Sequence, residues 1–74
     1  MVATLKLRAY MLQAGIGRTE VAKMLGISAY TLHKKIHNIT EFKANEILLL
    51  SEMLNISDKD EVFFNKDSDN KSLE

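Results

Sequence analysis

The segment from Ser28 to His37 contains several side chains of types that could do chemistry, including both histidines of the sequence. Hydroxyl groups, imidazole rings, a phenol and an ammonium group lie close together there, beside one small methyl: Ser28, Ala29, Tyr30, Thr31, His33, Lys34 and His37. Such side chains suit contact with phosphate oxygens and with the edges of bases. The segment therefore predicts a nucleic-acid contact surface, and an ordinary solvated helix face is the competing interpretation.

His33 and His37 stand four residues apart, a spacing that puts both imidazoles on one face of a helix and would suit two ligands of a metal ion. Zinc would still require a third or fourth ligand. The sequence has no cysteine, and no nearby acidic residue is expected to face inward. We therefore expect neither a bound metal nor another cofactor.

Catalysis is not expected either. A chain of 74 residues buries only about 60% of its unfolded surface, which is too little to enclose a deep active site. Its acidic residues fall at expected helix ends and surfaces rather than as a pair in a cleft. The sequence favours a binding module without a small-molecule substrate over an enzyme.

The net charge of zero conceals a difference between the two halves of the chain. Residues 1–43 hold seven lysines and arginines against two glutamates, whereas residues 44–74 hold three lysines against eight acidic residues. A basic half suits contact with phosphates, and an acidic half is repelled by them. The charge pattern agrees with phosphate contact, although a solvated surface explains it nearly as well.

Apolar periodicity and capping residues predict five helices and no strand, which is an all-α fold. The expected helices cover about 4–14, 18–25, a third segment from 29, a fourth from 44 and a short fifth near 58–63. Expected N-terminal residues are Thr4, Gly17 with Glu20, Ser28, Lys43 with Glu46, and Ser57 with Asp60. Expected C-terminal stops are Gly15, Gly26 and Asn55.

The third expected helix has a narrow apolar stripe, because only Leu32 and Ile36 are apolar at helical spacing. Most of its surface should therefore face outward, with Thr31 and Lys35 at the flanks of the exposed face. This helix is the element that positions the side chains described above.

The expected core consists of residues that follow the helical period across four segments: Val21, Ala22, Leu25, Ile27, Leu32, Ile36, Ile47, Leu50 and Leu54. Other apolar residues, which are most simply core, exceed what so small a domain covers: Leu48, Leu49, Met53, Phe63 and Phe64. The surplus would suit a homodimer seam or a patch for a partner protein.

Residues 65–74 are polar and charged apart from Leu73, so we expect a disordered tail after a domain of residues 1–64. The final Leu73 and Glu74 are consistent with residues added by an expression vector. The sequence has no cysteine, no signal-peptide pattern and no apolar run of about 18 residues. We therefore expect a soluble cytoplasmic protein without a membrane segment.

The turn Gly26-Ile27-Ser28 between two expected helices, with the small Ala22 at the helix crossing, has the pattern of a helix-turn-helix. Together with the apolar residues at Val21, Leu25, Ile27 and Leu32, it resembles the XRE-type regulators, the family of the lambda and 434 phage Cro and CI proteins. The resemblance covers residues 4–64. It implies a five-helix Cro/CI-like domain that binds operator DNA in a bacterial host cell.

The resemblance also implies residue roles. Arg18, Ser28 and Thr31 would contact phosphates, and the residues facing the major groove would be Ala29, Tyr30, His33 and Lys34. The family often has glutamine where Arg18 stands and a longer polar residue where Ala29 stands, so this sequence offers few groups for bidentate base recognition.

Small phage regulators of this kind also include modulators of repression, which act by binding a CI-type repressor protein. An interaction protein with the same fold is therefore the alternative. Its contact residues would be Tyr30, His33, His37, Phe63 and Phe64. The sequence does not separate the two functions, because both would use the third helix.

Overall fold

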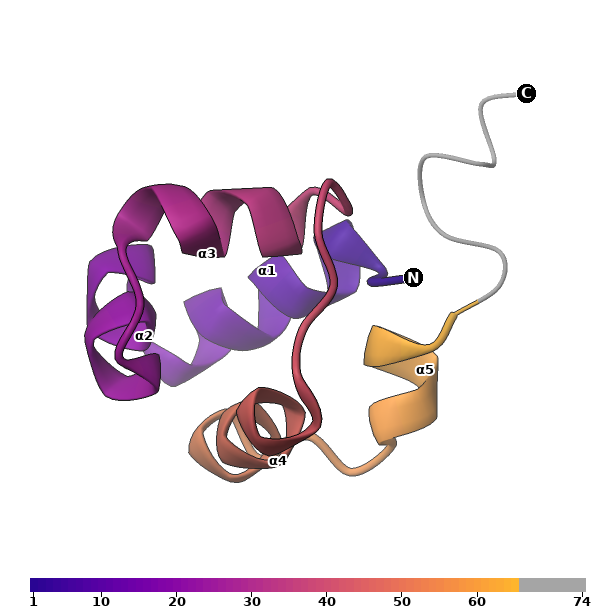
Figure 1. Ribbon diagram of the computed structural model, residues 1–74. Helices are drawn as coiled ribbons and strands as arrows, with labels where there is room; N and C mark the ends of the chain where they lie inside the picture. The colour runs from indigo at the N-terminus through magenta and orange to yellow at the C-terminus, as the bar shows by residue number, and fades with distance from the viewer. Residues whose placement is uncertain (66–74) are drawn as a thin grey trace.

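The computed structural model describes residues 1–65 and contains five helices and no strand within that range. The helices are α1 (Thr4–Ala14), α2 (Arg18–Leu25), α3 (Ala29–Ile36), α4 (Ala44–Met53) and α5 (Lys59–Phe63). In Figure 1, α1 and α3 run in opposite directions, α2 connects them at one end, and α4 lies beneath them. The all-α class and the expected helix bounds are confirmed for these residues. None of these helices has the length and apolar character needed to cross a membrane.

Thr4 does not cap α1, contrary to the expectation. Ala3 occupies the N-cap position, and Thr4 is the first helical residue and is buried. The Thr4 hydroxyl donates a hydrogen bond of 2.7 Å to the carbonyl of Ile36, at the end of α3. The Ala3 N–H donates at 2.8 Å to the carbonyl of Val62 in α5. The start of α1 is therefore fixed to two other helices, and this is why the hydroxyl is turned away from its own helix.

Three residues, Gly26, Ile27 and Ser28, connect α2 to α3. Gly26 has a φ of 72°, a left-handed conformation that glycine adopts without steric strain. The Ile27 N–H then donates to the Ala22 carbonyl at 3.0 Å and closes the end of α2. Ser28 caps α3, because its Oγ accepts a 3.0 Å hydrogen bond from the Thr31 N–H. The expected stop at Gly26 and the expected cap at Ser28 are both confirmed.

Helix α3 ends at a left-handed asparagine that also holds the N-terminal segment. Asn38 has a φ of 64°, and the following Ile39 N–H returns to the Lys34 carbonyl at 2.8 Å. The Asn38 side chain accepts a 2.7 Å hydrogen bond from the Val2 N–H and donates one of 3.0 Å to the Val2 carbonyl. The side-chain amide of Asn38 therefore satisfies both backbone groups of Val2 and connects the end of α3 to the segment before α1.

The ends of α4 follow the expected pattern. Lys43 is the N-cap residue, and its N–H donates a 2.8 Å hydrogen bond to Oε1 of Glu46, the third residue of the helix. At the other end, Asn55 has a φ of 58°, and the Ile56 N–H donates to the Ser51 carbonyl at 2.9 Å.

Two other expected capping arrangements differ. Asp58, not Ser57, caps α5, and its carboxylate accepts from two N–H groups of the first turn at 3.1 and 3.3 Å. A carboxylate at a helix N-terminus is favoured by the helix dipole as well as by these hydrogen bonds. Gly17 is the N-cap of α2 as expected, but Glu20 makes no return hydrogen bond to it among the described residues.

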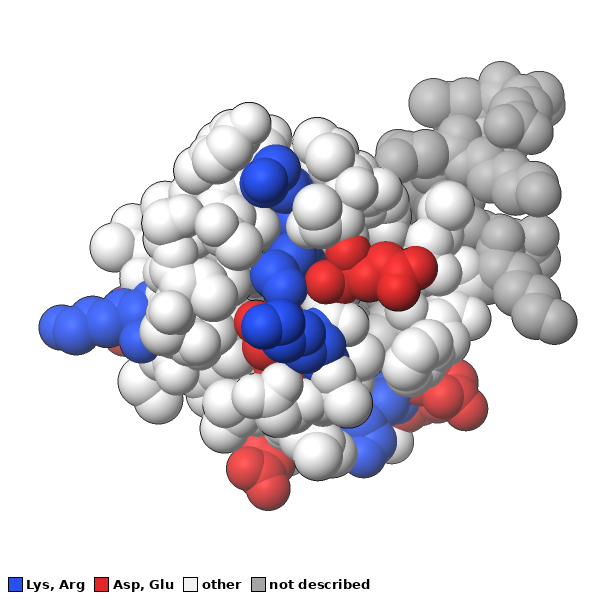
Figure 2. Space-filling view, viewed as in Figure 1, with Lys and Arg blue, Asp and Glu red and all other residues white. Residues whose placement is uncertain are grey.

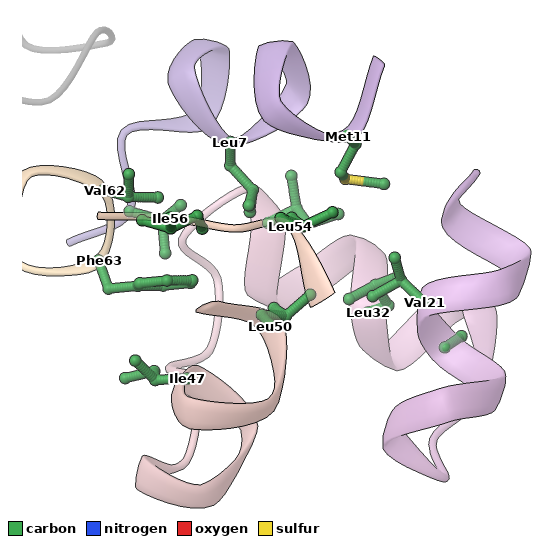
Figure 3. Close-up of a cluster of buried hydrophobic side chains, with 13 residues drawn as sticks. Leu7, Met11, Val21, Leu32, Ile47, Leu50, Leu54, Ile56, Val62 and Phe63 are labelled. Carbon is green, nitrogen blue, oxygen red and sulfur yellow. The ribbon is translucent and has the colours of Figure 1, made fainter. Parts of the chain in front are cut away.

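The core lies between the five helices, each of which contributes side chains to it, and the labelled side chains in Figure 3 converge there. The buried apolar residues are Val2, Ala3, Leu7, Met11, Val21, Ala22, Leu32, Ile36, Ile47, Leu50, Leu54, Ile56, Val62 and Phe63. Seven of the nine expected core residues are among them. Leu25 and Ile27 are only partly buried and pack against its edge.

Ala22 is buried on α2, the helix that packs against both α3 and α4. We expect Ala22→Leu to lower the free energy of unfolding by about 1 to 3 kcal/mol, because added methyl groups force neighbouring helices apart. Urea denaturation measures the change. Ala14→Leu, at the exposed end of α1, is the matched control and should have little effect. Equal stability of the two variants would show that the site at Ala22 has room for a larger side chain.

The expected tail and the terminal Leu73 and Glu74 lie outside the described residues, with the exception of Asn65. The Asn65 N–H donates to the Met1 carbonyl at 3.0 Å, and its side-chain amide donates to the Glu61 carbonyl at 3.0 Å. These hydrogen bonds join Asn65 to the N-terminal residue and to α5.

Candidate nucleic-acid interface

The outward surface of α3 carries Ala29, Tyr30 and His33 in exposed positions, as the sequence predicts. Tyr30 is 69% exposed, so its ring makes little contact with the core. Lys34 is half-buried, and its Nζ lies 5.0 Å from the centroid of the Tyr30 ring. This is a cation–π contact, which brings the phenol and the ammonium group together on the surface.

The two hydroxyl side chains at the start of α3 are bonded to each other. Ser28 Oγ donates to Thr31 Oγ1 at 2.9 Å while it accepts from the Thr31 N–H. The Ser28 hydroxyl hydrogen is thereby used within the protein. The Thr31 hydroxyl can still donate its own hydrogen, so of this pair Thr31 is the better phosphate contact.

Lys35 is buried, which corrects the expectation that it flanks the exposed face. Its side chain is only 7% exposed, and its Nζ contacts Glu46 Oε1 at 2.7 Å and the Glu41 carbonyl at 3.2 Å. Position 35 lies three residues after Leu32, so it borders the inward stripe of α3. Its positive charge is paired inside the protein and does not face a phosphate.

Arg18 is exposed at the first position of α2 and lies along a surface groove with two other basic side chains. These are Arg8 of α1 and His37, which follows α3. Burial lowers the pKa of His37, and the positive charges of His33, Arg18 and Arg8 lower it further. At neutral pH the two arginines therefore carry the charge of the groove, and the His37 ring is mostly neutral.

Arg8 is a site residue that the sequence analysis missed. It stands between Leu5 and Leu12, which are exposed and form a second apolar stripe on α1, separate from the buried Leu7 and Met11. The sequence of α1 therefore contains two sets of apolar residues at helical spacing. This pattern indicates that α1 has an apolar surface outside the core, and it is the signal that could have drawn attention to Arg8.

The aromatic residues at the end of the domain divide between core and surface. Phe63 is buried and meets Phe42 edge to face, with ring centroids 5.5 Å apart, so it cannot serve as a surface contact. Phe64 is 57% exposed, and the surplus apolar residues Leu48 and Leu49 of α4 are exposed as well. The sequence could not tell Phe63 from Phe64, because a helix this short has no clear periodicity.

His33 and His37 approach each other as the sequence predicts, with ring centroids 4.3 Å apart. No group of three or more histidine, cysteine or acidic residues within residues 1–65 is arranged to hold a metal ion. The positive charges of Arg8 and Arg18 also lie near the two rings, and they would repel a metal ion bound there.

Lysine and arginine side chains form a short column across the face shown in Figure 2, with acidic side chains directly beside it. The difference in charge between the two halves of the sequence therefore does not produce one continuous basic surface on this face.

Comparisons of this chain with protein-family models, curated proteins and solved structures found no match.

Proposed function

We propose that this protein is a small transcriptional regulator of the XRE type that binds double-stranded operator DNA with α3 in the major groove. The observation that supports this most strongly is the arrangement of α2 and α3. A left-handed Gly26 and a capping Ser28 join the two helices, and Leu32 and Ile36 bury one side of α3. The N-terminal half of α3 is left outward, as in helices that read the major groove.

In this proposal the phosphate contacts come from Arg18, Thr31 and Lys34, whose side chains carry available donors. Ala29, Tyr30 and His33 face the bases. The Ala29 methyl suits the methyl group of thymine, and the imidazole of His33 can donate to or accept from a base edge. By its resemblance to phage Cro and CI proteins, the proposed regulator would act in a lysis–lysogeny switch in the cytoplasm of a bacterial host.

The test is a binding titration of the full chain with duplex DNA that flanks its own gene, at two salt concentrations. Each phosphate contact releases counterions, so the binding constant should fall steeply as salt increases. A sequence-unrelated duplex of equal length is the control for specificity. Absence of binding at low salt would contradict the proposal.

A second function is favoured by the chemistry of the α3 surface. That helix has no arginine, asparagine or glutamine, the side chains best suited to bidentate base contacts, and its largest exposed side chain is Tyr30. Tyrosine is common among the residues that dominate protein interfaces. The alternative proposal is a modulator of repression that binds a CI-type repressor through Tyr30, His33 and His37. The exposed side chains of Leu48, Leu49 and Phe64 would then form either a homodimer interface or a second contact with the same partner.

Two substitutions on α3 separate these functions. If the protein binds DNA, Lys34→Ala should weaken binding to all sequences about equally and reduce the salt slope by roughly one, and Tyr30→Ala should matter less. If it binds a repressor, Tyr30→Ala should reduce repressor affinity by about 2 kcal/mol or more, while Lys34→Ala mainly slows association. The measurement is one titration series of the unsubstituted protein and the two variants against the DNA and against a purified CI-type repressor from the same phage or host. Binding to the repressor alone would exclude the regulator proposal, and binding to DNA alone would exclude the modulator.

A further inference from the structure

A groove runs along the side of the domain between α1, the start of α2 and the end of α3. Its apolar lining is contributed by α1 and α3, namely by Leu5, Ala9, Met11, Leu12 and Ile36. Its basic side chains are the two arginines, Arg8 and Arg18, and His37. We propose that this groove binds an acidic amphipathic helix of a partner protein. The inference does not depend on α3 contacting DNA.

The charge of the groove calls for an acidic partner. No aspartate or glutamate lines it, and the ion pairs within the described residues are Lys6 with Glu61 and Lys35 with Glu46. Arg8 and Arg18 therefore have no acidic partner within that part of the chain. Two arginines around a partly apolar surface attract carboxylates more strongly than two isolated surface charges would.

The apolar surface favours a protein segment over a nucleic acid. Leu12 is 84% exposed and Leu5 is 60% exposed on the same stripe of α1. A sugar–phosphate backbone would satisfy the arginines but would offer no apolar surface to Leu12. A helix with leucines along one face and glutamates at its edges satisfies both, as in other proteins that bind an amphipathic helix in a groove.

The probe for this proposal is a fluorescein-labelled peptide of about 16 residues, long enough to form a helix, with leucines on one face and glutamates on both flanks. One control peptide has lysine at every glutamate position, and a second has serine at every leucine position. The full chain, labelled with ¹⁵N, is titrated with each peptide. The acidic peptide should shift the amide resonances of Leu12, Gly17 and His37 and should bind more tightly than both controls.

Variants of the protein locate the site. Arg8→Glu combined with Arg18→Glu should weaken binding of the acidic peptide by about tenfold or more, because two attractive charges become repulsive. Lys23→Glu, at an exposed position of α2 outside the groove, is the matched control and should change affinity little. Leu12→Gln should also weaken binding. All four positions are exposed, so the variants should fold, and circular dichroism checks this directly.

The pH dependence gives an independent readout. Burial keeps the pKa of His37 low, and the charged groups that face it, His33 of α3, Arg18 of α2 and Arg8 of α1, lower it further. As the pH falls from about 7.5 through the lowered pKa of His37, that ring gains a proton, while the glutamates of the peptide stay ionised above about pH 5, so affinity should rise. His37→Gln should reduce this rise. Equal binding of the lysine peptide, or resonance shifts confined to another surface, would overturn the proposal. Shifts in the groove caused by duplex DNA but not by the acidic peptide would overturn it as well and would assign the groove to the DNA interface.

Discussion

Replacing Glu46 with alanine should lower the free energy of unfolding by about 3 to 5 kcal/mol, the range typical for breaking a buried ion pair from one side. The reason is the position of Lys35. Its Nζ lies 2.7 Å from Glu46 Oε1, and both side chains are almost completely buried. Without the carboxylate, the ammonium group keeps the Glu41 carbonyl at 3.2 Å and the Phe42 ring, whose centroid is 5.9 Å away, but no negative charge. Urea denaturation monitored by circular dichroism measures the loss.

The surface pair of Lys6 and Glu61 is the matched control. Its charged atoms are 3.6 Å apart, and about half of each side chain is exposed. Glu61→Ala should therefore change stability by less than about 1 kcal/mol. The double variant Lys35→Met with Glu46→Leu should recover most of the stability that Glu46→Ala loses, because no unpaired charge remains. Equal effects of Glu46→Ala and Glu61→Ala would show that the inner pair is not desolvated.

The same pair predicts how stability depends on pH. Burial by itself would raise the pKa of the Glu46 carboxyl, but the hydrogen bonds from Lys35 and from the Lys43 N–H, with the charges of both lysines, lower it below the usual value. A carboxyl with a lowered pKa in the folded state contributes stability above its unfolded pKa and loses it as the pH falls through the folded pKa. Stability should therefore decline in the acid range, below the usual glutamate pKa. Glu46→Gln should show a shallower decline in urea titrations at several acidic pH values.

The sequence predicted the helices because their ends are determined locally. Gly26, Ser28 and Asn55 act on the backbone groups next to them, so residue type and position are enough to place a helix end. The exposed face of α3 followed in the same way from the spacing of Leu32 and Ile36.

Features that depend on distant residues were missed. Lys35 looked like a surface lysine because its partner, Glu46, belongs to the next helix and had already been explained as a capping residue. Arg8 and Arg18 belong to different helices, and only the tertiary fold brings them to one groove. Helical periodicity within one segment contains no information about such pairings.

Asn38 is another residue whose role is tertiary, and Asn38→Ala should lower the free energy of unfolding by about 2 to 4 kcal/mol. Two effects add. Alanine is less tolerant than asparagine of the left-handed conformation, here at a φ of 64°, and the substitution removes both hydrogen bonds to Val2. The Val2 N–H and carbonyl would then lack partners in a partly buried place. Thermal and urea unfolding measure the total loss.

Two matched variants separate these effects. Asn55 also has a left-handed backbone, with a φ of 58°, but it is exposed and its side chain makes no hydrogen bond within residues 1–65. Asn55→Ala should therefore show the backbone effect alone, about 1 kcal/mol. Asn38→Gly keeps a residue that tolerates the left-handed conformation and loses the two hydrogen bonds.

Amide exchange provides the decisive comparison. The Ala3 N–H, which donates to Val62, lies next to the segment that Asn38 holds. Its exchange with solvent should become faster in Asn38→Ala and in Asn38→Gly, because the segment before α1 is released from the end of α3. In Asn55→Ala it should change only as far as global stability changes. If Asn38→Gly protects Ala3 as well as the unsubstituted protein does, the side chain of Asn38 does not hold the N-terminal segment, and its left-handed backbone alone accounts for its effect on stability.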